Sequence, residues 1–126
     1  MKKEKILNFV NKKVEYYKNR IFEIREASLD IPVSSLFNAY AEKWVDADFN
    51  LRYYQTLKFD IENNSTEDVD KVIKYIEHDI EKFNKEISNT HIGFNSTSIM
   101  LNLVRIWEYN AKKEMVKELK TLLLIV

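Results

Sequence analysis

The side chains with the clearest catalytic potential are the two histidines, His78 and His91. His78 lies between Glu77 and Asp79, and an imidazole beside a carboxylate is a pairing that general bases use. On a helix, however, adjacent residues point in different directions and do not face each other. The residues around His91 supply no nucleophile and base of the kind that acyl transfer needs. We therefore expect neither histidine to act in catalysis.

Motifs that mark catalytic and metal sites are missing from the chain. It contains no H-E-x-x-H, no Glu-x-x-His, no glycine-rich phosphate loop and no G-x-S-x-G. A di-metal carboxylate bundle would need a Glu-x-x-His pair on each of two helices. The absence of cysteine also excludes disulfides and thiolate metal sites. The sequence thus predicts a protein that is not an enzyme and that holds no metal or cofactor.

Aromatic residues are more informative than the titratable ones. The chain has 7 Tyr, 7 Phe and 2 Trp, which is many for 126 residues. On the predicted second helix, Phe49 and Tyr53 fall off the apolar stripe that contains Trp44 and Leu51. Aromatic side chains beyond the needs of the core are frequent anchors of protein interfaces. The alternative is a wide core, in which a helix is apolar over more than half of its girth.

Charge is distributed unevenly, although the formal net charge is +0. Residues 1–26 carry a net charge of +4, residues 27–91 carry −6 and residues 92–126 carry +2. An acidic surface can steer and select a basic partner, but basic ends can also complement an acidic middle within one fold. Combining charge with aromaticity, we expect a protein-binding surface on the second helix, next to the acidic third helix. It comprises Trp44, Asp46, Asp48, Phe49 and Tyr53.

Helices must position these residues, because the chain has only 1 glycine and 1 proline. Sheets need turns, and turns consume both residue types. Apolar residues recur at spacings of three and four, which lines one face of a helix. The spacing predicts an all-α fold, a single domain built as an antiparallel bundle of four long helices. We expect the helices at about residues 3–27, 33–62, 66–88 and 96–124.

The expected helix boundaries have clear local signals. Pro32 cannot continue the first helix but suits the first turn of the second. Ser65 and Ser96 are natural N-caps for the third and fourth helices. The stretch 46–48 is where the second helix would kink or divide, and we expect one long helix there.

Nucleic-acid binding is the alternative function. Basic side chains near the start of the chain would meet phosphates, which requires a concentrated positive field. Interleaved glutamates dilute that field, and the sequence pI of about 6.7 is poor for a duplex binder. We do not favour this alternative. The basic residues concerned are Lys2, Lys3, Lys5, Lys12, Lys13, Arg20 and Arg25.

The last eight residues are apolar around most of the helix and would aggregate if exposed. They must pack either on their own bundle or on a second copy of the chain. We expect self-association in a homodimer, since twofold symmetry is the default for oligomers. The residues concerned are Leu122, Leu123 and Ile125. The longest apolar run, residues 122–126, is too short to cross a bilayer, and no signal-peptide pattern is present. We therefore expect a cytoplasmic protein with no membrane partner.

Together these patterns predict a non-catalytic protein that binds another protein. An inhibitor, an adaptor and an accessory regulator fit equally well. The abundance of Lys, Ile, Asn, Tyr and Phe is typical of AT-rich coding sequences, which favours a small phage or mobile-element protein.

Overall fold

The fold was analysed in a computed structural model, which describes residues 2–31, 33–63, 69–89 and 99–126. Four α-helices follow one another in these residues, as predicted. They are α1 (Lys2–Ser28), α2 (Val33–Asn63), α3 (Val69–Asn89) and α4 (Ile99–Ile125). The predicted starts of the third and fourth helices, the caps Ser65 and Ser96, and His91 lie outside the described residues.

The second helix is continuous through residues 46–48, so the expectation of one long helix is confirmed. Side chains four residues apart support this stretch. The Asn50 amide donates to the Asp46 carbonyl oxygen at 2.8 Å, and Arg52 pairs with Asp48 at 3.0 Å. Pairs at this spacing meet on one side of a helix and stabilise it modestly. Asn50 is itself buried, and this bond partners its amide.

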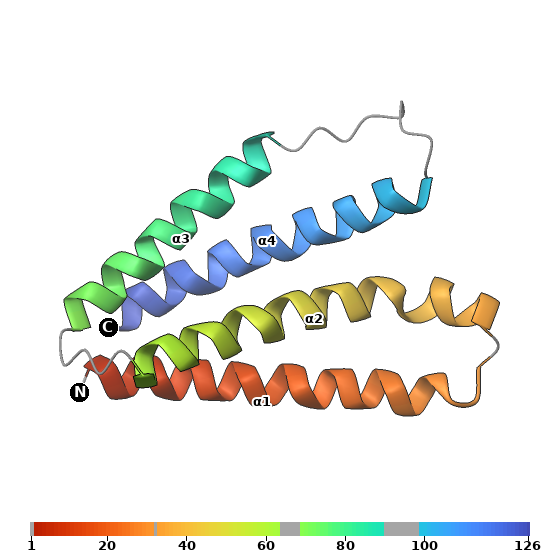
Figure 1. Cartoon of the computed structure of the whole chain (residues 1–126), viewed down its shortest axis with the longest axis horizontal. Coiled ribbons are helices and arrows are strands. Elements are labelled where there is room, and N and C mark those ends of the chain that lie inside the picture. The colour runs from red at the N-terminus through yellow and green to blue at the C-terminus, as the bar shows by residue number, and fades with distance from the viewer. Residues whose placement is uncertain (1, 32, 64–68, 90–98) are drawn as a thin grey trace.

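The helices form two antiparallel hairpins, α1 with α2 and α3 with α4 (Figure 1). Helices α1 and α2 pack along their whole length, α4 packs on α2, and α3 packs on α4. Both termini lie at one end of the molecule, on the left in Figure 1. The arrangement is a helical bundle, as the spacing of apolar residues predicted.

The core is built from the apolar faces that the spacing predicted. Each face is wider than a single line of residues, because most helices contact two neighbours. Helix α1 buries Ile6 as well as Val10, and α3 buries Val72 as well as Ile76. The largest fully buried side chains include Tyr54 and Leu119, which face the middle of the bundle from α2 and α4.

The bundle is packed unevenly along its length. In α4, buried side chains begin at Ala111 and continue to Leu122, whereas none of the described side chains from 103 to 110 is buried. We call the half with the termini the closed end. The opposite half, with residues 40–45 and 103–110, is the open end.

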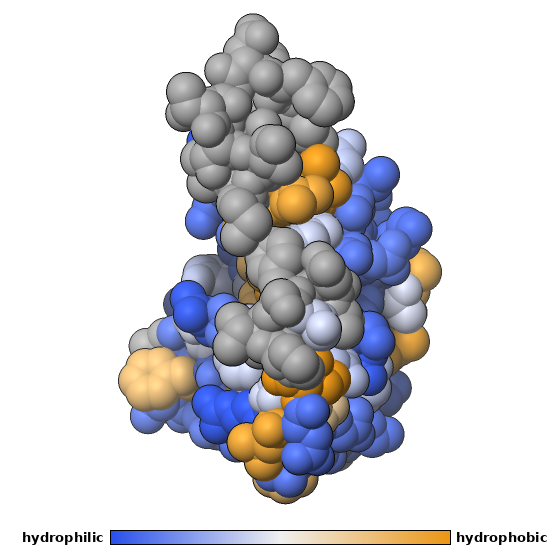
Figure 2. Space-filling view, turned by 90° about the vertical axis from the view of Figure 1, so that its right-hand side faces the viewer, coloured by the Kyte–Doolittle hydropathy of each residue, from blue (hydrophilic) through white to orange (hydrophobic). Residues whose placement is uncertain are grey.

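Figure 1 shows the cause of the difference. Helices α3 and α4 tilt away from the first hairpin towards the open end. Figure 2 looks onto that end, where the described apolar side chains emerge in separate groups between hydrophilic ones.

Candidate protein-binding groove

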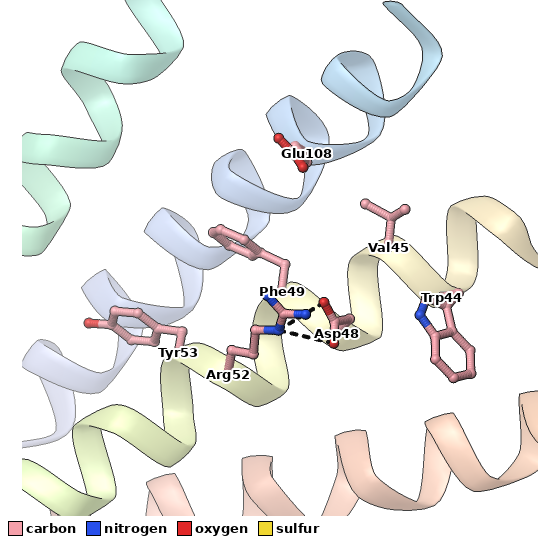
Figure 3. Close-up of a pocket in the computed structure, with 7 residues that line it drawn as sticks. All are labelled: Trp44, Val45, Asp48, Phe49, Arg52, Tyr53 and Glu108. Atoms are coloured by element: carbon pink, nitrogen blue, oxygen red, sulfur yellow. Dashed lines mark hydrogen bonds and ion pairs between the residues drawn. The ribbon is translucent and has the colours of Figure 1, made fainter. Parts of the chain in front are cut away.

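A groove lies between α2 and α4 near the middle of the bundle (Figure 3). It encloses about 280 Å³, and six of its seven lining residues come from α2. The seventh, Glu108, comes from α4. The lining residues are Trp44, Val45, Asp48, Phe49, Arg52, Tyr53 and Glu108.

The spacing along α2 explains how one helix supplies most of this groove. Val45, Asp48, Phe49 and Arg52 are three or four residues apart, so they share one face. The groove therefore combines apolar side chains with a charged rim, which is the usual composition of binding pockets.

Helix α3 packs against two of the residues that line the groove, Phe49 and Tyr53. The ring of Phe83 makes edge-to-face contacts with Phe49, at 5.9 Å between centroids, and with Tyr53, at 5.6 Å. The Tyr53 hydroxyl also donates to Asp79 on α3 at 2.8 Å. Burial, together with this bond, raises the pKa of Tyr53 above its ordinary value. Both aromatic residues thus contribute to the fold as well as to the groove.

The rim of the groove carries charges of both signs. Arg52 Nε lies 3.0 Å from one carboxylate oxygen of Asp48 and 3.2 Å from the other. The pair is marked by dashed lines in Figure 3. Glu108 stands across the groove on α4 and is exposed. A partner would therefore meet one carboxylate that is balanced by Arg52 and a second that is exposed.

Four of the five residues predicted for protein binding meet in this groove: Trp44, Asp48, Phe49 and Tyr53. The Trp44 ring points towards α1 (Figure 3). There the Arg25 guanidinium lies 5.8 Å from its centroid, which fits a cation–π contact. The indole therefore forms the edge of the groove that lies towards α1.

Asp46, the fifth predicted residue, lies on a different face of α2. It lines a second cavity of about 240 Å³ between α1, α2 and α4, together with Arg20, Trp107 and Glu114. Burial raises the pKa of Asp46, and Glu118 adds to the rise while Arg20 opposes it. Helical spacing explains the separation, since residues two apart point in nearly opposite directions.

Sequence reasoning missed the polar cluster around Glu118, which joins three helices. Its carboxylate accepts hydrogen bonds from Tyr54 at 2.8 Å, from Lys13 at 3.0 Å and from Tyr17 at 3.4 Å. Burial and the nearby Glu118 charge raise the pKa of both tyrosines, so their hydroxyls stay protonated and act as donors. A signal was present in the sequence, because Glu118 is three residues after Met115 and shares its apolar face.

The three residues predicted for self-association differ in their surroundings. Leu122 is fully buried in the core of the single chain. Leu123 is partly buried against that core, and Ile125 is 49% exposed. Leu124, which was not predicted, is 86% exposed. The tail thus covers itself in part, because Leu122 faces the middle of the bundle.

His78 is the one histidine among the described residues. It is exposed on α3. In the residues that the structure covers, no three His, Cys, Asp or Glu side chains are grouped to hold a metal ion. Nor does any helix within those residues have the length and apolar character needed to span a membrane.

Comparisons with other proteins give no family for the chain. It matches no protein family, no curated protein and no solved structure.

Proposed function

We propose that the chain acts by binding another protein through the groove between α2 and α4. The observation that carries the proposal is the meeting of Trp44, Asp48, Phe49 and Tyr53 in one cavity with Glu108. Aromatic anchors inside a concave site with a charged rim are typical of interface hot spots. The protein would work as an inhibitor, an adaptor or an accessory regulator, encoded by a phage or another mobile element.

The partner surface would place an apolar side chain between Val45 and Phe49 and a basic side chain near Glu108. The acidic character of α2 supports the second contact, since this helix carries five acidic and three basic residues. Complementary charge of this kind sets association rate and selectivity more than affinity.

Substitutions at the mouth of the groove test the proposal. Val45→Arg together with Glu108→Lys places bulk and positive charge where the partner would sit. Immobilised wild-type chain should retain at least one protein from a lysate of the native host, and the double variant should lose it. A matched control, Glu77→Lys with His78→Arg on exposed positions of α3, should retain the same protein.

Circular dichroism would first establish that both variants keep the helical content of the wild type. Retention of every captured protein by the groove variant would show that the groove is not the binding surface. Loss from both variants would instead indicate a response to charge alone.

A further inference from the structure

A second surface lies on α1 and α4, away from the groove. On α1, Lys5, Lys12 and Tyr16 are exposed, and Tyr16 is exposed by 57%. Their spacings of seven and four place them on one side of the helix. At 1.5 Å per residue the two lysines are about 10 Å apart along α1. An aromatic ring therefore follows two cations along one exposed stripe.

Between Lys5 and Tyr16 the glutamates of α1 do not interrupt this stripe. At 100° per residue, Glu4 and Glu15 lie about 80–100° around the helix from its centre. Glu23 lies on the stripe itself, seven residues after Tyr16, where Arg20 pairs with it at 3.6 Å. Much of the dilution expected from sequence order thus disappears when the helix is formed, because interleaved residues point to different sides. Up to Tyr16, the exposed charges on the stripe are positive.

Tertiary packing adds lysines from α4 to the same side of the molecule. Lys13 on α1 pairs with Glu118 on α4 at 3.0 Å, which places the two helices next to each other. Lys117 directly precedes Glu118, and Lys113 and Lys120 lie one turn to either side. All three are exposed. Helices α1 and α4 each carry a net positive charge, +4 and +2 respectively.

On this side, the carboxylates of Glu118 and Glu114 already have lysine or tyrosine partners. Glu118 accepts its bonds from Lys13 and two tyrosines. Glu114 pairs with Lys117 at 3.2 Å, where both side chains are well exposed. An exposed pair three residues apart contributes little and is readily exchanged for another anion. Lys117 is therefore able to exchange the Glu114 carboxylate for a phosphate.

We propose that this basic face binds the phosphate backbone of a single-stranded nucleic acid, with Tyr16 stacking on an unpaired base. The face comprises Lys5, Lys12, Tyr16, Lys113, Lys117 and Lys120. Lysines spread over two helices neutralise successive phosphates, and exposed aromatic rings stack on bases without selecting a sequence. A duplex keeps its bases stacked internally and gives Tyr16 no partner.

Fluorescence anisotropy with labelled oligothymidine of about 20 nucleotides tests the proposal, since single-strand sites occupy fewer nucleotides than that. Wild-type chain should bind, and its affinity should fall steeply as salt rises from about 50 to 200 mM. Lys12→Glu with Lys117→Glu should weaken binding at least about tenfold and flatten the salt dependence. Tyr16→Ala should weaken it about fivefold or more without changing the salt slope.

The matched control is Lys71→Glu with Lys74→Glu, a double charge reversal at exposed positions of α3. It should leave affinity close to that of the wild type. Equal losses in the two double variants would overturn the basic face as the site, because only net charge would matter.

Three competitors separate the ligand classes. Excess unlabelled oligothymidine should displace the probe. A duplex of the same length should be a weaker competitor. Displacement by polyglutamate or by anionic lipid vesicles at equal charge would overturn nucleic acid as the ligand. Absence of any oligothymidine binding at low salt would overturn the proposal and leave the groove proposal untouched, since the two surfaces share no residue.

Discussion

The closed and open ends of the bundle use the same helices in different ways. At the closed end, all four helices meet over buried side chains such as Tyr54, Ile76 and Leu119. At the open end, the apolar residues of α4 that the structure describes, such as Ile106, are half-buried. Both cavities involve side chains from that end of α2 and α4. Burial stabilises one end, while the other keeps concave surface.

The difference teaches that the apolar pattern of a helix does not reveal how much of it is covered. Helix α4 is apolar on one side along most of its length, but only its second half lies close to its neighbours. Its tilt separates a half that stabilises the fold from a half that remains accessible. Elements of low local stability are commonly those that bind and move.

The largest expected effect comes from truncating the core at each end of α4. Leu119→Ala should lower the free energy of unfolding by about 3 kcal/mol, because it leaves a cavity in a fully buried site. Ile106→Ala should cost about 1 kcal/mol, since much of that side chain already contacts water. Urea denaturation of the two variants measures both values. Equal losses in the free energy of unfolding would show that the open end is packed as tightly as the closed end.

A smaller effect is expected from the polar cluster of the closed end. Tyr54→Phe removes the hydroxyl that donates to Glu118 at 2.8 Å and should cost about 1.5–3 kcal/mol, the range for hydrogen bonds to charged groups. Tyr40→Phe at the open end is the matched control and should change stability by less than about 0.5 kcal/mol. A neutral Tyr54→Phe variant would mean that the Glu118 cluster does not contribute to stability.

The smallest effect concerns Asp46, which lies between the two ends. Burial and Glu118 raise its pKa, so the folded chain holds this proton more tightly than the unfolded chain does. Its contribution to stability is therefore greatest below the ordinary aspartate pKa of about 3.9, and it falls as pH rises through the raised value. Asp46→Asn carries no charge to bury.

Thermal unfolding of this variant gives the sign directly. Its Tm should exceed that of the wild type by a few degrees at most at pH 7, and the difference should vanish towards about pH 4, as linkage requires. A lower Tm at pH 7 would show that the attraction of Arg20 outweighs burial.

The sequence by itself determined the helical class, the number of helices and most of their ends. One glycine, one proline and regular spacings of three and four leave a chain few other regular structures. The sequence also indicated that α2 carries aromatic side chains outside its main apolar stripe, namely Phe49 and Tyr53. These features depend on residues close in the chain, so local physics decides them.

Tertiary structure alone decided which of those residues meet. It brought Glu108 across to the groove and enclosed Glu118 between donors from α1 and α2. It also buried Leu122 in its own core. The tilt and rotation of α4 set each of these outcomes. They depend on how side chains of distant helices interlock, which no periodicity within one helix encodes.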